Sequence, residues 1–197
     1  MTLPSNITTH VICDGDSLTK GSKSTGLNDY PNKLMYINNS ISAVNLGVNS
    51  QRIDAMLTNA ATKIDALYEG TSITNSIVVC WGGTNDLASF GRSDTDVYND
   101  IVSYCGGRQT AGFKVIVLTI LPSTQYSAGE ETYRQSVNTS IRANWATFAD
   151  ALVDVAADTR LDDFNDSTYF DADKIHLTDD GYAVVASLVN DAIEALV

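Results

Sequence analysis

Five short apolar runs alternate with stretches of helical pattern along this chain of 197 residues, and this alternation limits the possible folds most strongly. Residues 77–81 and 115–118 are almost continuously apolar, which is typical of strands covered on both faces in a parallel sheet. Alternating strands and helices predict an α/β fold, a three-layer α/β/α sandwich with right-handed crossover connections. The length favours a single domain over residues 1–197.

The strand-like runs place several polar motifs at one edge of the predicted sheet. We expect strands at residues 10–14, 43–47, 76–83, 114–121 and 151–156, and helices at 30–39, 51–68, 95–110, 130–150 and 178–196. In such folds the ligand site lies beyond the carboxyl ends of the strands. Ser17 follows the first strand, Gly47 ends the second, Asn85 follows the third, and Asp173 and His176 precede the last helix. These residues are therefore expected on the same rim.

The chain contains only two histidines, and a hydroxyl nucleophile needs a base that accepts a proton near neutral pH. His10 opens the first strand-like run. His176 follows Asp173 by three residues, a spacing that lets the carboxylate accept a hydrogen bond from the imidazole ring. If the chain is a serine hydrolase, His176 is its base and Asp173 orients the ring. A surface aspartate beside a capping histidine would have the same spacing.

Ser17 is the candidate nucleophile, because a strand-to-helix turn can present its hydroxyl and its backbone N–H to a cleft. An isolated Gly-Asp-Ser triplet is equally an ordinary helix cap. The backbone amides of Ser17 and Gly47 and the side-chain amide of Asn85 would suit an oxyanion hole, where each donor contributes roughly 3–4 kcal/mol. The plainer alternatives are a strand end at Gly47 and a turn residue at Asn85. We expect Asp16 to hold the nucleophile turn.

Four blocks of the sequence resemble those of the GDSL/SGNH hydrolases, in the order in which that family carries them. They are Gly15-Asp16-Ser17-Leu18, Asn45-Leu46-Gly47, Gly82-Gly83-Thr84-Asn85-Asp86 and residues 173–182. The resemblance implies that Ser17 is the nucleophile, His176 the base and Asp173 its partner, with Gly47 and Asn85 completing the oxyanion hole. It also implies a flavodoxin-like sheet of five parallel strands in the order 2-1-3-4-5, and chemistry that needs no metal or cofactor.

One departure from the family pattern concerns the wall of the site. Family members often carry a second glycine three residues after the one that matches Gly47, and Ser50 stands there in this chain. The change leaves the catalytic atoms in place but bears on the shape of the wall and on substrate choice. Asn49, Gln51 and Arg52 are near enough to contact a substrate, although a helix start is the expected role of the last two.

Composition narrows the class of partner. The net charge is −12, from 24 acidic and 12 basic residues, and such a surface repels phosphate backbones and anionic membranes, so neither is an expected partner. No apolar run approaches the ~20 residues that span a bilayer. The first residues lack the pattern of a signal peptide, so we expect a soluble protein, cytoplasmic or secreted if a leader has been removed.

The three cysteines are expected to be structural. Cys13, Cys80 and Cys105 match no zinc or disulfide spacing. Two of them lie inside strand-like runs, where a cysteine behaves as a small buried hydrophobe.

The expected function is that of a cofactor-independent serine esterase that cleaves short acyl esters, such as acetyl esters of small molecules or carbohydrates, through an acyl-enzyme intermediate. Residues 122–131 and 162–172 are expected to shape the pocket, with Tyr169 and Phe170 either stacking on substrate or packing internally. Alternatives are a carbohydrate-binding module on a hydrolase scaffold, and a thioesterase or lysophospholipase. A flavodoxin-like nucleotide binder would need a phosphate-binding glycine loop with a lysine, which the sequence lacks.

Overall fold

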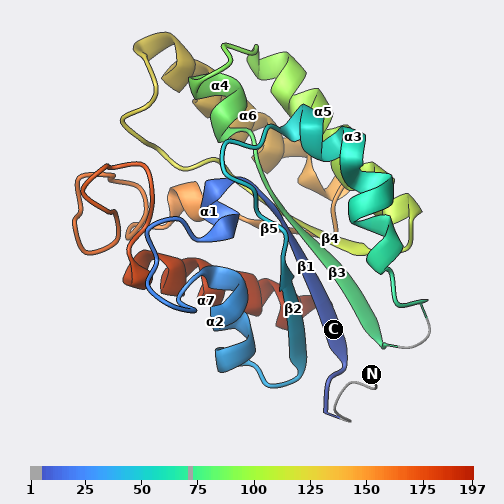
Figure 1. The fold of residues 1–197 in the computed structure, drawn as a ribbon. Coiled ribbons are helices and arrows are strands. Elements are labelled where there is room, and N and C mark those ends of the chain that lie inside the picture. The colour runs from blue at the N-terminus through green and yellow to red at the C-terminus, as the bar shows by residue number, and fades with distance from the viewer. Residues whose placement is uncertain (1–5, 71–72) are drawn as a thin grey trace.

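The computed structural model describes residues 6–70 and 73–197. Its centre is a five-stranded parallel sheet in the order β2-β1-β3-β4-β5 (Figure 1), which confirms the expected fold class and strand order. The strands are β1 (Thr9–Gly15), β2 (Ile41–Asn45), β3 (Asn75–Trp81), β4 (Lys114–Leu118) and β5 (Ala151–Val153). Strand β2 lies two residues earlier than predicted, and β4 and β5 are shorter than predicted.

The helices follow the predicted alternation, with two short additions at the site. They are α1 (Ser17–Lys20), α2 (Tyr30–Ile37), α3 (Ile53–Lys63), α4 (Thr84–Ala88), α5 (Asp94–Thr110), α6 (Ala128–Asn144) and α7 (Asp179–Leu196). Short 3-10 helices within the described residues include η1 (Asp65–Leu67), η3 (Trp145–Thr147) and η4 (Val155–Ala157). Helix α6 begins at a capping box in which Ser127 and Glu130 bond each other's backbone. Thr178 caps α7 by accepting a hydrogen bond from the Gly181 N–H.

Two hydrophobic cores lie on opposite faces of the sheet because side chains alternate along each strand. On β3, Ile77 and Val79 pack with α2 and α7, whereas Val78 and Cys80 pack with α3, α5 and α6. Figure 1 shows the same layers, with α2 and α7 on one side of the strands and α3, α5 and α6 on the other. The nearly continuous apolar runs thus reflect burial on both faces.

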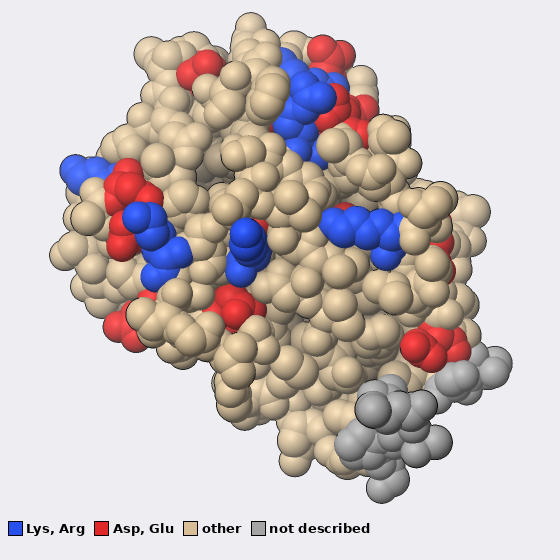
Figure 2. Space-filling model, in the orientation of Figure 1, with Lys and Arg blue, Asp and Glu red and all other residues tan. Residues whose placement is uncertain are grey.

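The distribution of surface charge and the burial of the cysteines agree with what the composition predicts. On the face shown in Figure 2, most basic side chains lie beside acidic ones and form no continuous basic patch. Among residues 6–70 and 73–197, no helix is long and apolar enough to cross a membrane. The three cysteines are buried and form no disulfide, as expected of small core residues.

Candidate active site

The candidate nucleophile lies where β1 turns into α1. Asp16 is the N-cap of α1, and its Oδ1 accepts a hydrogen bond of 2.9 Å from the Leu18 N–H. Ser17 is the first residue of this short helix and is half-buried. Its backbone N–H has no hydrogen-bond partner within the described part of the chain. The turn therefore leaves both the hydroxyl and the amide of Ser17 available to the cleft.

The candidate base lies on a loop closed by its own backbone. Phe170 and Leu177 form an antiparallel bridge at its base, and the Asp171 N–H donates to the His176 carbonyl at 2.8 Å. Inside the loop, Asp173 Oδ1 accepts hydrogen bonds of 3.0 Å from the backbone N–H groups of Ile175 and His176. These bonds hold the carboxylate and the imidazole on the same side of the loop.

The loop and the nucleophile turn meet in a continuous chain of polar atoms. His176 Nε2 lies 2.9 Å from Ser17 Oγ, and His176 Nδ1 lies 2.8 Å from Asp173 Oδ2. A carboxylate beside Nδ1 favours the tautomer that carries its proton there, which leaves Nε2 free to accept the serine proton. The structure thus brings together three sequence-predicted residues separated by up to 159 positions.

Asp173 is held in its ionised form. Partial burial would raise the pKa of this carboxyl group, but hydrogen bonds from the His176 N–H, the His176 ring and the Ile175 N–H outweigh it and lower the pKa. The carboxylate that faces the imidazole therefore carries its charge at neutral pH.

The second histidine lies at the opposite end of β1. His10 is buried near the amino end of that strand, whereas Ser17 follows the carboxyl end. Burial lowers the pKa of His10, and the nearby Glu69 only partly opposes this. Its Nδ1 atom has no hydrogen-bond partner among the described residues. His10 is thus far from Ser17, as expected if His176 is the base.

Gly47 does not line the cleft, unlike Ser17, Asn85 and His176. Its N–H donates to Asn45 Oδ1 at 3.0 Å, and Gly47 does not line the cavity beside Ser17. A Cβ at this position would lie 2.2 Å from the Lys20 N atom and 2.7 Å from its Cα. Glycine is required here because the backbone packs directly on α1, so the prediction of an oxyanion donor at Gly47 finds no support in this geometry.

Ser50 occupies the place where we had expected Gly47. Asn49 and Ser50 are the central residues of a turn closed by a 3.1 Å bond from the Gln51 N–H to the Val48 carbonyl. The φ angle of Ser50 is +59°, in the left-handed region that favours glycine. Ser50 lines the cavity with Ser17, and its N–H has no partner in the described part of the chain. In the sequence, this turn is marked by Ser50, which stands where members of the resembling family often carry a glycine.

Asn85 lies across the cleft at the start of α4. Gly83, at φ +110°, turns the chain from β3 into this helix. Asn85 Nδ2 donates to Asp16 Oδ2 at 3.3 Å and to the Gln51 carbonyl at 3.1 Å. These two acceptors orient the side chain so that its nitrogen, rather than its oxygen, faces the nucleophile turn. Because Asp16 is fully buried, its pKa is raised to about 7.

Two further buried carboxylates brace the turn that carries Ser50, and the sequence analysis missed both roles. Asp86 accepts hydrogen bonds from the Ile53 N–H at 2.9 Å and from Arg92 at 2.8 Å. Asp14 pairs with Lys63 at 3.0 Å and lies 3.4 Å from the side-chain nitrogen of Gln51. Only the positions of Asp14 and Asp86 in the sequence could have indicated these roles, because each stands next to a motif at the end of a buried strand.

The cleft itself has a volume of about 370 Å³ and is lined by polar residues. All the residues that line it carry a hydroxyl, amide, ammonium or imidazole group: Ser17, Ser22, Lys23, Asn49, Ser50, Asn85, Ser89, Gln125 and His176. Gln125 comes from the predicted pocket loop 122–131. Phe170 is buried in the core, so of its two predicted roles packing is correct. Within the described residues, no cluster of side chains could hold a metal ion.

One known protein family matches most of the chain. Residues 13–184 match the model of the GDSL-like Lipase/Acylhydrolase family. Because the match covers most of the chain, the protein belongs to this family of hydrolases. No curated protein sequence matches the chain.

Solved structures share the fold over nearly the whole chain. A lipolytic protein of the G-D-S-L family from Veillonella parvula is 20% identical with a TM-score of 0.78, covering 93% of this chain and 97% of its own. The carbohydrate acetylesterase Est24 from Sinorhizobium meliloti is 16% identical with a TM-score of 0.71, covering 95% and 99%. The psychrotrophic esterase EstA from Pseudoalteromonas sp. is 16% identical with a TM-score of 0.69, covering 96% and 98%. At these identities the likeness concerns the fold.

Proposed function

We propose that this protein is a serine esterase in which Ser17 attacks the ester carbonyl, His176 moves the proton and Asp173 orients the imidazole. The observation that carries the proposal is the chain of contacts at 2.9 and 2.8 Å from Ser17 Oγ through the ring of His176 to Asp173. In the first step Ser17 Oγ forms a bond to the acyl carbon, and its proton passes to His176 Nε2. His176 then gives that proton to the leaving alcohol as the ester bond breaks. A water molecule, activated by the same nitrogen, releases the acid and restores Ser17.

We place the oxyanion hole at the backbone N–H groups of Ser17 and Ser50 and the Nδ2 group of Asn85. The two backbone amides have no partner in the described part of the chain, and all three residues line the cleft. The contact from Asn85 to Asp16 is the longer of its two, at 3.3 Å, and is the one that we expect an oxyanion to share. Such preorganised donors stabilise the charge that develops on the carbonyl oxygen.

We infer that the preferred acyl group is short, with acetyl as the simplest case. The cleft of about 370 Å³ is lined by polar side chains, so it offers little apolar surface on which a long acyl chain could be buried. Each buried CH₂ group would contribute about 0.8 kcal/mol in an apolar pocket, and that gain is missing here. The polar lining suits a hydroxyl-rich alcohol, and the fold is shared with an enzyme described as a carbohydrate acetylesterase. Esters of carbohydrates are therefore the substrates that we favour.

A panel of p-nitrophenyl esters from acetate to dodecanoate tests this proposal. We expect kcat/KM to be highest for acetate and to fall as the chain lengthens. Ser17→Ala should lower kcat by about 10⁶-fold, because the nucleophile is lost while the fold is kept. Ser187→Ala, at an exposed position of α7, is the matched control and should leave the activity unchanged. Equal hydrolysis by wild type and Ser17→Ala would overturn the proposal, and saccharide binding without turnover would favour a binding module instead.

A further inference from the structure

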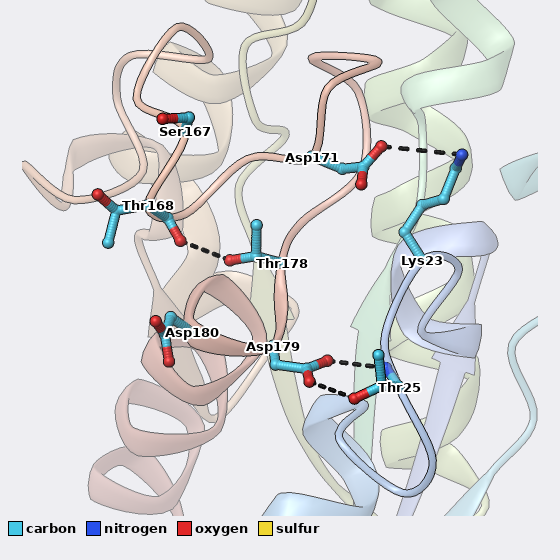
Figure 3. A pocket seen from close by; sticks show the side chains of 8 residues that line it. All are labelled: Lys23, Thr25, Ser167, Thr168, Asp171, Thr178, Asp179 and Asp180. Carbon is cyan, nitrogen blue, oxygen red and sulfur yellow. Dashed lines mark hydrogen bonds and ion pairs between the residues drawn. The ribbon is translucent and has the colours of Figure 1, made fainter.

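A second cavity lies beside the catalytic cleft. Its volume is about 560 Å³, within the range of roughly 300–1,000 Å³ that is usual for small-ligand sites. Figure 3 shows its walls, which come from the segment after α1, the chain before the base loop and the start of α7. The lining residues are Lys23, Thr25, Ser167, Thr168, Asp171, Thr178, Asp179 and Asp180. Lys23 also lines the catalytic cleft, so the two cavities share a wall.

The second cavity lies on the side of the cleft from which a leaving alcohol departs. Because His176 must give its proton to the leaving oxygen, the alcohol has to lie next to His176 rather than next to the oxyanion donors. Lys23 Nζ lies 3.8 Å from Asp173 Oδ2 and 3.7 Å from Asp171 Oδ2. Asp173 belongs to the triad and Asp171 to the second cavity. An alcohol too large for the cleft would therefore extend past Lys23 into this space.

The lining offers hydrogen-bonding groups that the protein does not use itself. Thr25 donates its N–H and its hydroxyl to Asp179, and the Thr178 hydroxyl donates to the Thr168 carbonyl (Figure 3). Ser167 and Asp180 are exposed and make no such contact with the other residues drawn there. A ligand with several hydroxyl groups could donate to the Asp180 carboxylate and exchange hydrogen bonds with Ser167.

The charge of the cavity restricts the ligand further. Three carboxylates, from Asp171, Asp179 and Asp180, stand against the one ammonium group of Lys23. Hydrogen bonds to charged acceptors are stronger than those between neutral groups, so hydroxyl donors bind well in such a site. A ligand that carries its own carboxylate would be repelled.

We propose that this cavity is a subsite for a neutral sugar unit of the leaving alcohol, which makes the enzyme an esterase of acylated neutral saccharides. The proposal rests on the serine esterase function given above. It goes beyond that function by assigning the part of the substrate that is not transferred to Ser17, and it names Asp180 and Ser167 as residues that set specificity.

The test compares two esters in the same enzyme: mono-O-acetyl xylobiose, which has a neutral sugar alcohol, and p-nitrophenyl acetate, which has none. Asp180→Ala should raise KM for acetyl xylobiose about tenfold, the loss expected for one hydrogen bond to a charged acceptor. Ser167→Trp, which fills the cavity from an exposed loop, should raise it at least as much. KM for p-nitrophenyl acetate should change less than twofold in both variants.

Matched controls come from the exposed side of α7. Asp191→Ala removes the same charge from the same helix, and Ser187→Trp adds the same ring, both outside the cavity. Neither should change KM for acetyl xylobiose. An acetylated glucuronate should be a poorer substrate for the wild type than acetyl xylobiose.

Three results would overturn the subsite, and they separate its failure from that of the esterase function. Ser17-dependent hydrolysis of both esters with no selective rise of KM in the Asp180 and Ser167 variants would contradict the subsite alone. Preference for the glucuronate ester would contradict its assignment to neutral sugars. If the wild type hydrolysed neither ester, the esterase function itself would fail, and the subsite with it.

Discussion

The two sides of the proposed catalytic cleft are built differently. Ser17, Asn85 and the turn that carries Ser50 follow the ends of β1, β3 and β2. They are braced by three carboxylates that are at most 1% exposed, namely Asp14, Asp16 and Asp86. Asp173 and His176 stand on a surface loop held by its own backbone, and their side chains are 27% and 18% exposed. The nucleophile side is thus part of the core, whereas the base side is a local attachment to it.

This difference implies that catalysis and stability are coupled on the side of Ser17 and separable on the side of His176. A change among the bracing carboxylates disturbs a buried hydrogen-bond network and hence the fold. A change in the base loop disturbs a few local bonds that water can replace. The variants below test this contrast.

Among the variants that test this contrast, Asp173→Asn should have the largest effect on activity and almost none on stability. The amide oxygen can still accept the two backbone hydrogen bonds, but the amide favours the wrong tautomer of His176. We expect kcat to fall by about 10⁴-fold while the midpoint of thermal unfolding stays within ~2 °C of wild type. Asp162→Asn, at an exposed position outside both cavities, is the control and should leave kcat unchanged. Turnover near that of wild type would mean that another group orients the imidazole.

Asp86→Ala should have the largest effect on stability. The substitution leaves the buried Ile53 N–H without its acceptor and removes one of the two carboxylates that bond Arg92. Breaking such a buried pair destabilises a fold by about 3–5 kcal/mol. Urea unfolding measures the loss, with Asp162→Ala on the exposed surface as the control. Equal stability of the two variants would contradict the bracing role.

Asp16→Asn should lower kcat about tenfold. This loss is smaller than the one caused by removing a whole oxyanion donor, because Asn85 stays in place but is oriented less well. Its amide can still accept from Leu18, but it then turns an NH₂ group towards the NH₂ group of Asn85. Asn85 therefore loses the acceptor that orients it. The measurement is kcat for p-nitrophenyl acetate, and an unchanged kcat would show that Gln51 alone holds Asn85.

The same variant tests the pH dependence of stability. The pKa of Asp16 is raised to about 7 in the folded protein, whereas an unfolded chain titrates near about 3.9. Between these values the folded state binds more protons than the unfolded state, so stability from this group falls as the pH rises from about 4 to about 7. Asp16→Asn cannot titrate, so its unfolding free energy should lack this decline. Parallel pH profiles for the two proteins would contradict the shift.

Ser50→Gly should have the smallest effect, a gain in stability of about 0.5–1 kcal/mol. Glycine relieves the left-handed backbone at this position, and its greater freedom in the unfolded chain offsets part of the gain. The backbone N–H stays in place, so kcat should be unchanged. Chemical denaturation measures the gain, and a loss of stability would mean that the Ser50 hydroxyl matters more than its φ angle.

The sequence predicted most of the fold because its signals were local. Continuous apolar runs marked β3 and β4, and Thr178 marked the start of α7. The boundaries that failed depend on tertiary contacts: the helix predicted at 130–150 ends at Asn144, where the chain turns towards β5.

Within the site, the structure brings together Ser17, Asp173 and His176, which were chosen by chemical type. The backbone direction at Gly47 differs from the one expected for an oxyanion donor. The scarcity of histidine singled out His176, and Asp173 followed from spacing. Gly47 was assigned as a donor because a glycine at a strand end suggests close approach to substrate. Its close approach is to Lys20 of α1 instead, which no local pattern reveals. The buried roles of Asp14 and Asp86 likewise require the three-dimensional arrangement.

The central claim is that Ser17 is activated by His176, and covalent labelling tests it most directly. The protein is treated with a fluorophosphonate, and the modified residue is located by peptide mass spectrometry. We predict one adduct, on the peptide that contains Ser17, with labelling abolished in Ser17→Ala and strongly slowed in His176→Ala. An adduct on a different residue, or esterase activity that survives complete labelling of Ser17, would contradict the account.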